Sequence, residues 1–121
     1  MRILGFQRKW EKLQKPEFTT FRFERRDKDW QLGEQVQIVY KPRHKDREIL
    51  GIAVIVGKEF RSPDAELPKR NIISISDEEA KEDGFMDYED MWNWLLEVYG
   101  DEDKLMFEPM NKLTLRKIGS W

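Results

Sequence analysis

Residues 15–45 interleave basic and aromatic side chains, the residue types best suited to contact phosphates and bases. Guanidinium groups form paired, charge-assisted hydrogen bonds with phosphate oxygens, and aromatic rings stack on bases. The candidate contacts are Arg22, Arg25, Arg26, Trp30, Lys41, Arg43 and Lys45. We expect RNA or a nucleotide to be the partner of this segment.

Each of these candidates also has a structural interpretation. Acidic residues are interspersed among the arginines and can neutralise part of their charge. The basic loop, residues 41–47, is polar and contains Pro42, so it can be a solvated hairpin tip. Trp30 lies shortly before the strand-entry residue Gly33, a position that favours a buried ring over a stacking platform.

The charges are distributed unevenly along the chain. Residues 1–58 contain 14 Lys and Arg against 8 Asp and Glu, residues 59–121 contain 8 against 16, and the whole chain carries −2. A chain polarised in this way presents one face suited to polyanions and another that repels them. A protein partner would bind the acidic second half, where Trp94 and Trp121 are the aromatic residues expected to be exposed.

The chain contains no cysteine and a single histidine, His44, which lies in the basic loop. Disulfides, thiolate nucleophiles and thiolate metal sites are therefore excluded. A Ser-His-Asp triad or a multi-histidine metal site would depend on this one imidazole. We predict no metal site and no cofactor, and the sequence indicates no oligomeric state.

Capping residues predict a short helix over residues 77–83. Ser76 and Glu79 form the pattern of a capping box, and Gly84 provides a left-handed stop. A second helix is predicted over residues 88–99, where apolar residues recur at helical spacing. Its aromatic residues on that stripe, Tyr88, Trp92 and Tyr99, are expected in the core. A third, short helix is expected at residues 8–13.

Strand patterns dominate the rest of the chain. Strands are expected at residues 19–24, 35–40, 48–60, 71–75 and 104–118, the last of them broken near Pro109. The second and third should pair antiparallel across the basic loop, with a bulge or bend at Gly57. This order predicts an α+β fold in which a small, partly open β-barrel of five to six strands carries two or three peripheral helices. Residues 1–121 should form a single domain.

The longest apolar run, residues 49–56, is far shorter than the roughly 20 residues that a membrane-spanning helix requires. The first residues lack the charged and then apolar pattern of a secretory leader. We expect a cytoplasmic protein without membrane contact.

Three short motifs follow one another along the chain. They are LQKPEFTTFR at residues 13–22, WQLGE at residues 30–34 and ISDEEAKEDGF at residues 75–85. In this order they resemble the ASCH domain family of PUA-like barrels. The resemblance implies a β-barrel with a cleft between the barrel and its helices, in which relatives bind RNA or modified nucleosides.

Some small ASCH proteins are similar to amidohydrolases that act on acetylated cytidine and carry a Lys, a Thr and a Glu in this cleft. The resemblance places the Thr at Thr20, but it places the Lys position at Glu17 and the Glu position at Asp83. A carboxylate cannot replace an amine as nucleophile or base without a change of mechanism. Lys15 is the amine that can substitute, so an enzyme would use Thr20, Asp83, Lys15 and Glu17.

The leading hypothesis is an RNA- or nucleotide-binding module of ASCH/PUA-like type. Its basic cleft is expected to be lined by Thr20, Arg22, Arg25 and Asp83, with Lys15 and Glu17 at the rim. A small amidohydrolase or nuclease acting on modified nucleosides or RNA is the alternative. A protein-interaction domain is a second alternative.

Overall fold

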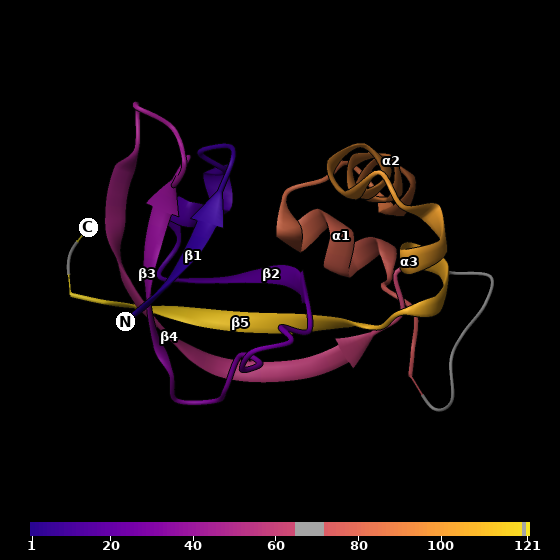
Figure 1. The fold of residues 1–121 in the computed structure, drawn as a ribbon, viewed down its shortest axis with the longest axis horizontal. Coiled ribbons are helices and arrows are strands. Elements are labelled where there is room, and N and C mark those ends of the chain that lie inside the picture. Colours follow the sequence, from indigo (N-terminus) through magenta and orange to yellow (C-terminus); the bar gives the residue numbers. More distant parts are fainter. Residues whose placement is uncertain (65–71, 120) are drawn as a thin grey trace.

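The computed structural model describes residues 1–64, 72–119 and 121. Its elements are the strands β1 (Arg2–Phe6), β2 (Glu17–Phe23), β3 (Gln35–Tyr40), β4 (Glu48–Arg61) and β5 (Met110–Ile118), the 3₁₀ turn η1 (Glu11–Gln14), and the helices α1 (Asp77–Asp83), α2 (Tyr88–Tyr99) and α3 (Glu102–Phe107). The strands form one sheet that curls into a half-barrel, and the three helices gather at one end of it (Figure 1). The predicted α+β class and partly open barrel are thus confirmed at this level.

The strand order in the sheet is β1-β3-β4-β5-β2. The predicted antiparallel pair of β3 and β4 is present, and β5 pairs antiparallel with both β4 and β2. The register between β4 and β5 shifts between Ile55 and Gly57, where a bulge was predicted. This bulge accompanies the bend of the long strand β4, which curves along the outside of the half-barrel (Figure 1).

Helix α1 begins and ends as its capping residues predict. The Ser76 hydroxyl accepts from the Glu79 N–H at 3.1 Å, and the Glu79 carboxylate accepts from the Ser76 N–H at 3.1 Å. Gly84 then adopts a φ of 113°, which stops the helix. Helix α2 has the predicted bounds, with Asp87 as its N-cap and Gly100 at its end.

Several predictions about the elements were wrong. The predicted helix at residues 8–13 is replaced by η1, which starts later. Residues 104–107, at the start of the strand expected over residues 104–118, belong to helix α3, because Asp101 caps its N-terminus by accepting from the Lys104 N–H at 3.1 Å. The strand β1 was not predicted, and it pairs in parallel with β3.

The strand expected at residues 71–75 is only partly testable, since residue 71 lies outside the described residues. Within residues 72–75 the structure has a single isolated bridge, between Ser74 and Ser62. Tyr99, expected in the core, is 37% exposed, while its ring packs on Phe23 at 4.9 Å between centroids. Trp94, expected to be exposed, is half-buried.

Two buried clusters form the core. One fills the curl of the sheet and includes Leu4, Phe6, Phe18, Trp30, Val36, Ile38, Ile55 and Leu113. The other joins the helices to β2 and β5 and includes Phe21, Phe85, Met91, Leu95, Leu105 and Met110. Trp10 packs against both clusters, so it marks the junction between sheet and helices.

Among the described residues, no helix is both long enough and apolar enough to cross a membrane.

Candidate ligand-binding cleft

A cleft of ≈ 200 Å³ lies at this junction, and we name it the central cleft. It is lined by Gly5, Phe6, Gln7, Trp10, Lys12, Thr20, Phe21, Arg22, Asp83, Phe85, Trp94 and Val98. They come from the end of β1 and the residues that follow it, from η1, β2, α1 and α2, and from the connection between α1 and α2. Thr20, Arg22 and Asp83 therefore line one hollow, three of the four residues for which the resemblance led us to expect this.

A buried ion pair lines the central cleft. The Lys12 ammonium lies 2.6 Å from a carboxylate oxygen of Asp83, and the two side chains are 4% and 9% exposed. The ammonium also donates to the Thr19 carbonyl at 2.8 Å. Burial lowers the pKa of Lys12 and raises the pKa of Asp83, while their mutual attraction opposes both shifts.

The Thr20 hydroxyl lies beside this pair in a state ready to donate a hydrogen bond. The Arg22 Nε–H donates to the Thr20 oxygen at 3.2 Å, and another N–H of Arg22 donates to the Gly5 carbonyl at 2.8 Å. Because the Thr20 oxygen accepts from Arg22, its own hydrogen remains available for a ligand. The second carboxylate oxygen of Asp83 accepts no hydrogen bond from any described residue and can serve as an acceptor.

Aromatic rings form the walls of the central cleft. The centroid of the Trp10 ring lies 5.1 Å from the centroid of Phe85 and 5.6 Å from that of Trp94. Trp10 and Trp94 meet edge to face. Trp10 reaches this position because Gly84, at the end of α1, has no side chain: a Cβ there would lie 2.9 Å from the Trp10 ring. Such walls favour a flat ligand that can stack.

Lys12 is the site residue that the sequence did not reveal. A lysine in a short, polar turn is ordinarily exposed, so burial was not expected. The signal available was the resemblance itself, which implied an amine next to Thr20 and found Glu17 at the corresponding position. In the structure an amine of η1, that of Lys12, lines the central cleft.

Lys15 and Glu17 do not line the central cleft. With Lys12, Phe18, Thr19, Glu82 and Thr114 they line a neighbouring hollow of ≈ 270 Å³. Side chains alternate between the two faces of a strand, so Glu17 and Thr19 point away from the face that carries Thr20. Glu17 also pairs with Arg116 across the sheet at 3.2 Å.

Arg25 and Arg26 line a third hollow, of ≈ 450 Å³, together with Phe23, Glu24, Lys104, Glu108 and Pro109. The expectation that Arg25 lines the same cleft as Thr20 and Asp83 was therefore wrong. Arg25 pairs with Asp27 at 3.0 Å, as the structural interpretation of the arginines proposed. This hollow carries charges of both signs.

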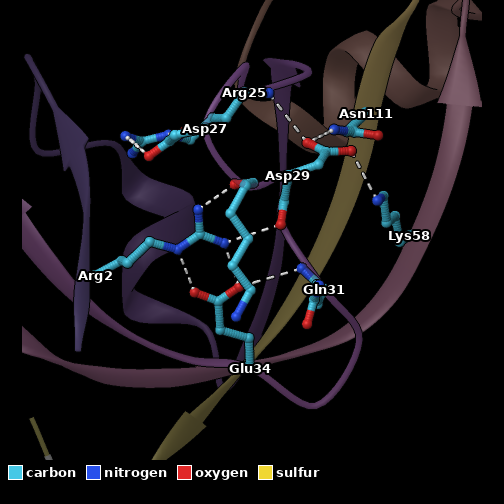
Figure 2. Close-up of polar contacts among 9 residues, drawn as sticks. Arg2, Arg25, Asp27, Asp29, Gln31, Glu34, Lys58 and Asn111 are labelled. Atoms are coloured by element: carbon cyan, nitrogen blue, oxygen red, sulfur yellow. Dashed lines mark hydrogen bonds and ion pairs between the residues drawn. The ribbon is translucent and has the colours of Figure 1, made fainter.

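The segment between β2 and β3 is fixed by its acidic residues (Figure 2). Asp29 pairs with Lys58 at 2.8 Å and accepts from the Asn111 amide at 2.8 Å. Arg2 pairs with Glu34 at 2.5 Å and donates to the backbone carbonyl of Asp29 at 3.0 Å. Asp29 and Glu34 therefore balance Lys58 and Arg2, two basic residues that lie outside residues 15–45.

Trp30 is 4% exposed and belongs to the sheet core, with the Arg2 guanidinium 4.5 Å above its ring. In this position its ring cannot act as a surface platform for a base, which agrees with the buried alternative. Arg43 and Lys45 lie exposed in the basic loop. The Lys41 N–H donates to the Phe6 carbonyl at 2.8 Å, which joins the start of this loop to the edge of the central cleft.

Within the part of the chain that the structure describes, no group of three or more His, Asp or Glu side chains is arranged to hold a metal ion.

No family model, curated protein or solved structure matches this chain. The resemblance to ASCH domains therefore stays a prediction.

Proposed function

We propose that the protein is an RNA- or nucleotide-binding module of ASCH/PUA-like type that receives a base in the central cleft. The observation that supports this most is the combination of aromatic walls with a polar floor in which Thr20 and Asp83 offer complementary groups. A flat ligand gains stacking energy from the walls, and single-stranded RNA binders use the same contacts.

The hydrogen-bonding groups of the floor suit the edge of a base. The Thr20 hydroxyl can donate and the free oxygen of Asp83 can accept, and base edges present donors and acceptors side by side. Both groups are buried, so a ligand that satisfied only one of them would leave the other unpaired at a cost of about 1–3 kcal/mol. The cleft therefore favours polar rings over purely apolar ones.

Isothermal titration with the four ribonucleoside 5′-monophosphates and with short single-stranded RNA tests the proposal. Thr20→Val keeps the shape of the side chain and removes its hydroxyl, so the affinity of the preferred base should fall about tenfold. Thr114→Val is the matched control, since Thr114 lies outside the central cleft. Absence of binding by wild-type protein, or equal losses in the two variants, would reject the proposal.

A second candidate, hydrolysis of an amide on such a ligand, is favoured by the buried Lys12–Asp83 pair beside Thr20. Burial lowers the pKa of the Lys12 amine, which increases the fraction of neutral amine that can accept a proton. Burial also raises the pKa of the Asp83 carboxyl, which suits proton transfer near neutral pH. In this reaction water adds to the amide carbonyl, the C–N bond breaks and the leaving amine takes a proton. The resemblance implies a Lys, a Thr and a Glu; here Lys12 would supply the amine, and Asp83 stands at the Glu position.

Mass spectrometry after incubation with N-acetylated cytidine tests this second candidate, with cytidine and acetate as the expected products. Asp83→Asn should reduce turnover at least 100-fold, because general acid–base groups typically contribute 10²–10⁴-fold. Turnover that persisted in the variant, or its absence in wild-type protein, would count against hydrolysis while leaving the binding proposal intact.

A further inference from the structure

Arg8 is held at the central cleft by two aromatic rings. Its guanidinium carbon lies 4.3 Å from the centroid of Trp10 and 4.4 Å from the centroid of Trp94, and both rings are walls of the cleft. Gln7, the preceding residue, also lines the cleft, whereas Arg8 itself is exposed. The guanidinium therefore lies at the outer edge of the cleft, in contact with both solvent and the walls.

Arg8 differs from four other arginines of the described residues in having no carboxylate partner. Four arginines are paired with carboxylates, namely Arg2 with Glu34, Arg25 with Asp27, Arg61 with Glu79, and Arg116 with Glu17. No carboxylate of the described residues lies within 4.0 Å of the Arg8 guanidinium. Aromatic faces attract a cation without cancelling its charge, so Arg8 is ordered and still carries its full field.

An ordered guanidinium with unoccupied N–H groups is a suitable partner for phosphate. The planes of Trp10 and Trp94 are 84° apart, so the flat face of the guanidinium can stack on only one of them. No N–H group of Arg8 donates a hydrogen bond to a described residue, so its donors can bind two phosphate oxygens at once. Because Trp10 and Trp94 already restrict the side chain, less conformational entropy is lost when it binds. A base in the cleft would carry its sugar phosphate towards the edge, where Arg8 lies.

We propose that Arg8 is the phosphate-reading residue of the central cleft, and that the ligand is a phosphorylated nucleotide or an RNA segment, not a free nucleoside. This inference rests on the proposed function and names the class of ligand for the same site. Arg22 lies deeper, with its donors on Thr20 and the Gly5 carbonyl, and so contributes to the interior of the cleft.

Isothermal titration with the four ribonucleosides and with their 5′- and 3′-monophosphates tests the inference. Wild-type protein should bind at least one monophosphate on the order of 10- to 100-fold more tightly than its nucleoside, as a charge-assisted pair provides. Arg8→Ala should lower the ratio of monophosphate to nucleoside affinity most of the way to one, and it should leave the nucleoside affinity unchanged within about twofold. Arg8→Lys keeps the charge but loses the paired N–H donors of the guanidinium. Its ratio of monophosphate to nucleoside affinity should therefore fall between those of wild-type protein and Arg8→Ala.

Arg47→Ala is the matched control, because it removes the same charge from an exposed residue of the basic loop. It should retain the wild-type ratio. Equal losses in Arg8→Ala and Arg47→Ala would overturn the inference in favour of a general field effect. If Arg8→Ala weakened the affinities for nucleoside and monophosphate by the same factor, the inference would also be overturned. Arg8 would then act only by holding Trp10 and Trp94 in place.

The two proposals fail in different ways. If wild-type protein binds nucleosides and monophosphates equally, the role of Arg8 is rejected and base binding stands. If none of these compounds nor the short RNAs bind, the proposed function is rejected and the inference with it.

Discussion

Among single residues, the buried Lys12–Asp83 pair matters most for the chemistry proposed in the central cleft. Two charges taken out of water are costly to bury, and their attraction offsets this cost only while both are present. The pair lines the central cleft, where a ligand can reach Asp83. The desolvation cost of the two charges makes the pair a weak source of stability, and the same desolvation shifts both pKa values, which is useful for chemistry. Sites of this kind concentrate shifted pKa values.

Removing one member of the pair should destabilise the protein more than removing both. Lys12→Met and Asp83→Leu alone should each lower the free energy of unfolding by about 3–5 kcal/mol, because each leaves a buried charge without a partner. The double variant should recover a large part of this loss. Urea unfolding measures all three, and simple additivity of the two losses would show that the pair is not coupled.

At the scale of elements, the end of α1 determines where a wall of the cleft stands. Gly84 combines a φ of 113° with close contact to Trp10, so any side chain there meets both backbone strain and a ring. Gly100 at the end of α2 has a φ of 62° and open space around a Cβ. Substitution of Gly100 therefore measures the cost of backbone strain alone, whereas substitution of Gly84 measures this cost together with that of the clash with Trp10.

Gly84→Ala should lower the free energy of unfolding by about 2–4 kcal/mol and weaken ligand binding, since Trp10 must move. Gly100→Ala should cost only about 1 kcal/mol and leave binding unchanged. Thermal unfolding and titration of both variants check this. Equal stability losses together with unchanged binding in Gly84→Ala would mean that Trp10 does not depend on Gly84.

The segment between β2 and β3 is a second element held by charge. The hydrogen bond from Arg2 lowers the pKa of Glu34 below its ordinary value of 4.5. Since the unfolded chain takes up this proton first as the pH falls, the stability supplied by Glu34 is complete above about pH 4.5 and is lost as the pH falls through the lower, folded-state pKa.

Glu34→Gln should therefore flatten the acid limb of the stability profile and cost about 1 kcal/mol at pH 7, where the partly exposed pair is screened. Urea unfolding at a series of pH values between 3 and 7 measures the effect. A profile with the same acid slope as wild-type protein would contradict the assignment of this charge to Glu34.

Across the whole molecule, the sequence predicted local structure better than distant pairing. The bounds of α1 and α2 follow from residues within one turn of each end, and the β3–β4 pair joins neighbours across a short loop. Nothing in the five residues of β1 signals a parallel partner in β3, more than thirty residues away. The short α3 was not predicted, because its clearest local signal is the N-cap residue Asp101 and a strand pattern follows shortly after it.

The candidate site was predictable to a similar degree. Thr20, Arg22 and Asp83 were expected in one cleft, because a resemblance supplied spatial information that periodicity does not contain. Lys12 and the aromatic walls were not expected, since burial of a lysine and the convergence of Trp10 with Trp94 depend on how η1 docks against the helices. Such docking is a tertiary property.

The basic charge of the first half of the chain should make RNA binding depend on salt concentration. If Arg8, Lys41 and Arg43 each neutralise one phosphate, the slope of log K against log salt for single-stranded RNA should be near −2, and Arg8→Ala should reduce its magnitude by about 0.7. Titrations of a short RNA between 50 and 300 mM salt, on the order of physiological strength, measure this slope. A flat dependence would exclude phosphate contacts by these residues.

The most direct test of the central claim is the amide and indole N–H spectrum of the ¹⁵N-labelled protein during titration with the four ribonucleoside 5′-monophosphates. We expect the largest changes at the indole N–H groups of Trp10 and Trp94 and at the backbone amides of Lys12, Thr20 and Asp83. Changes confined to the basic loop, or no changes with any of these compounds, would contradict a base-binding central cleft.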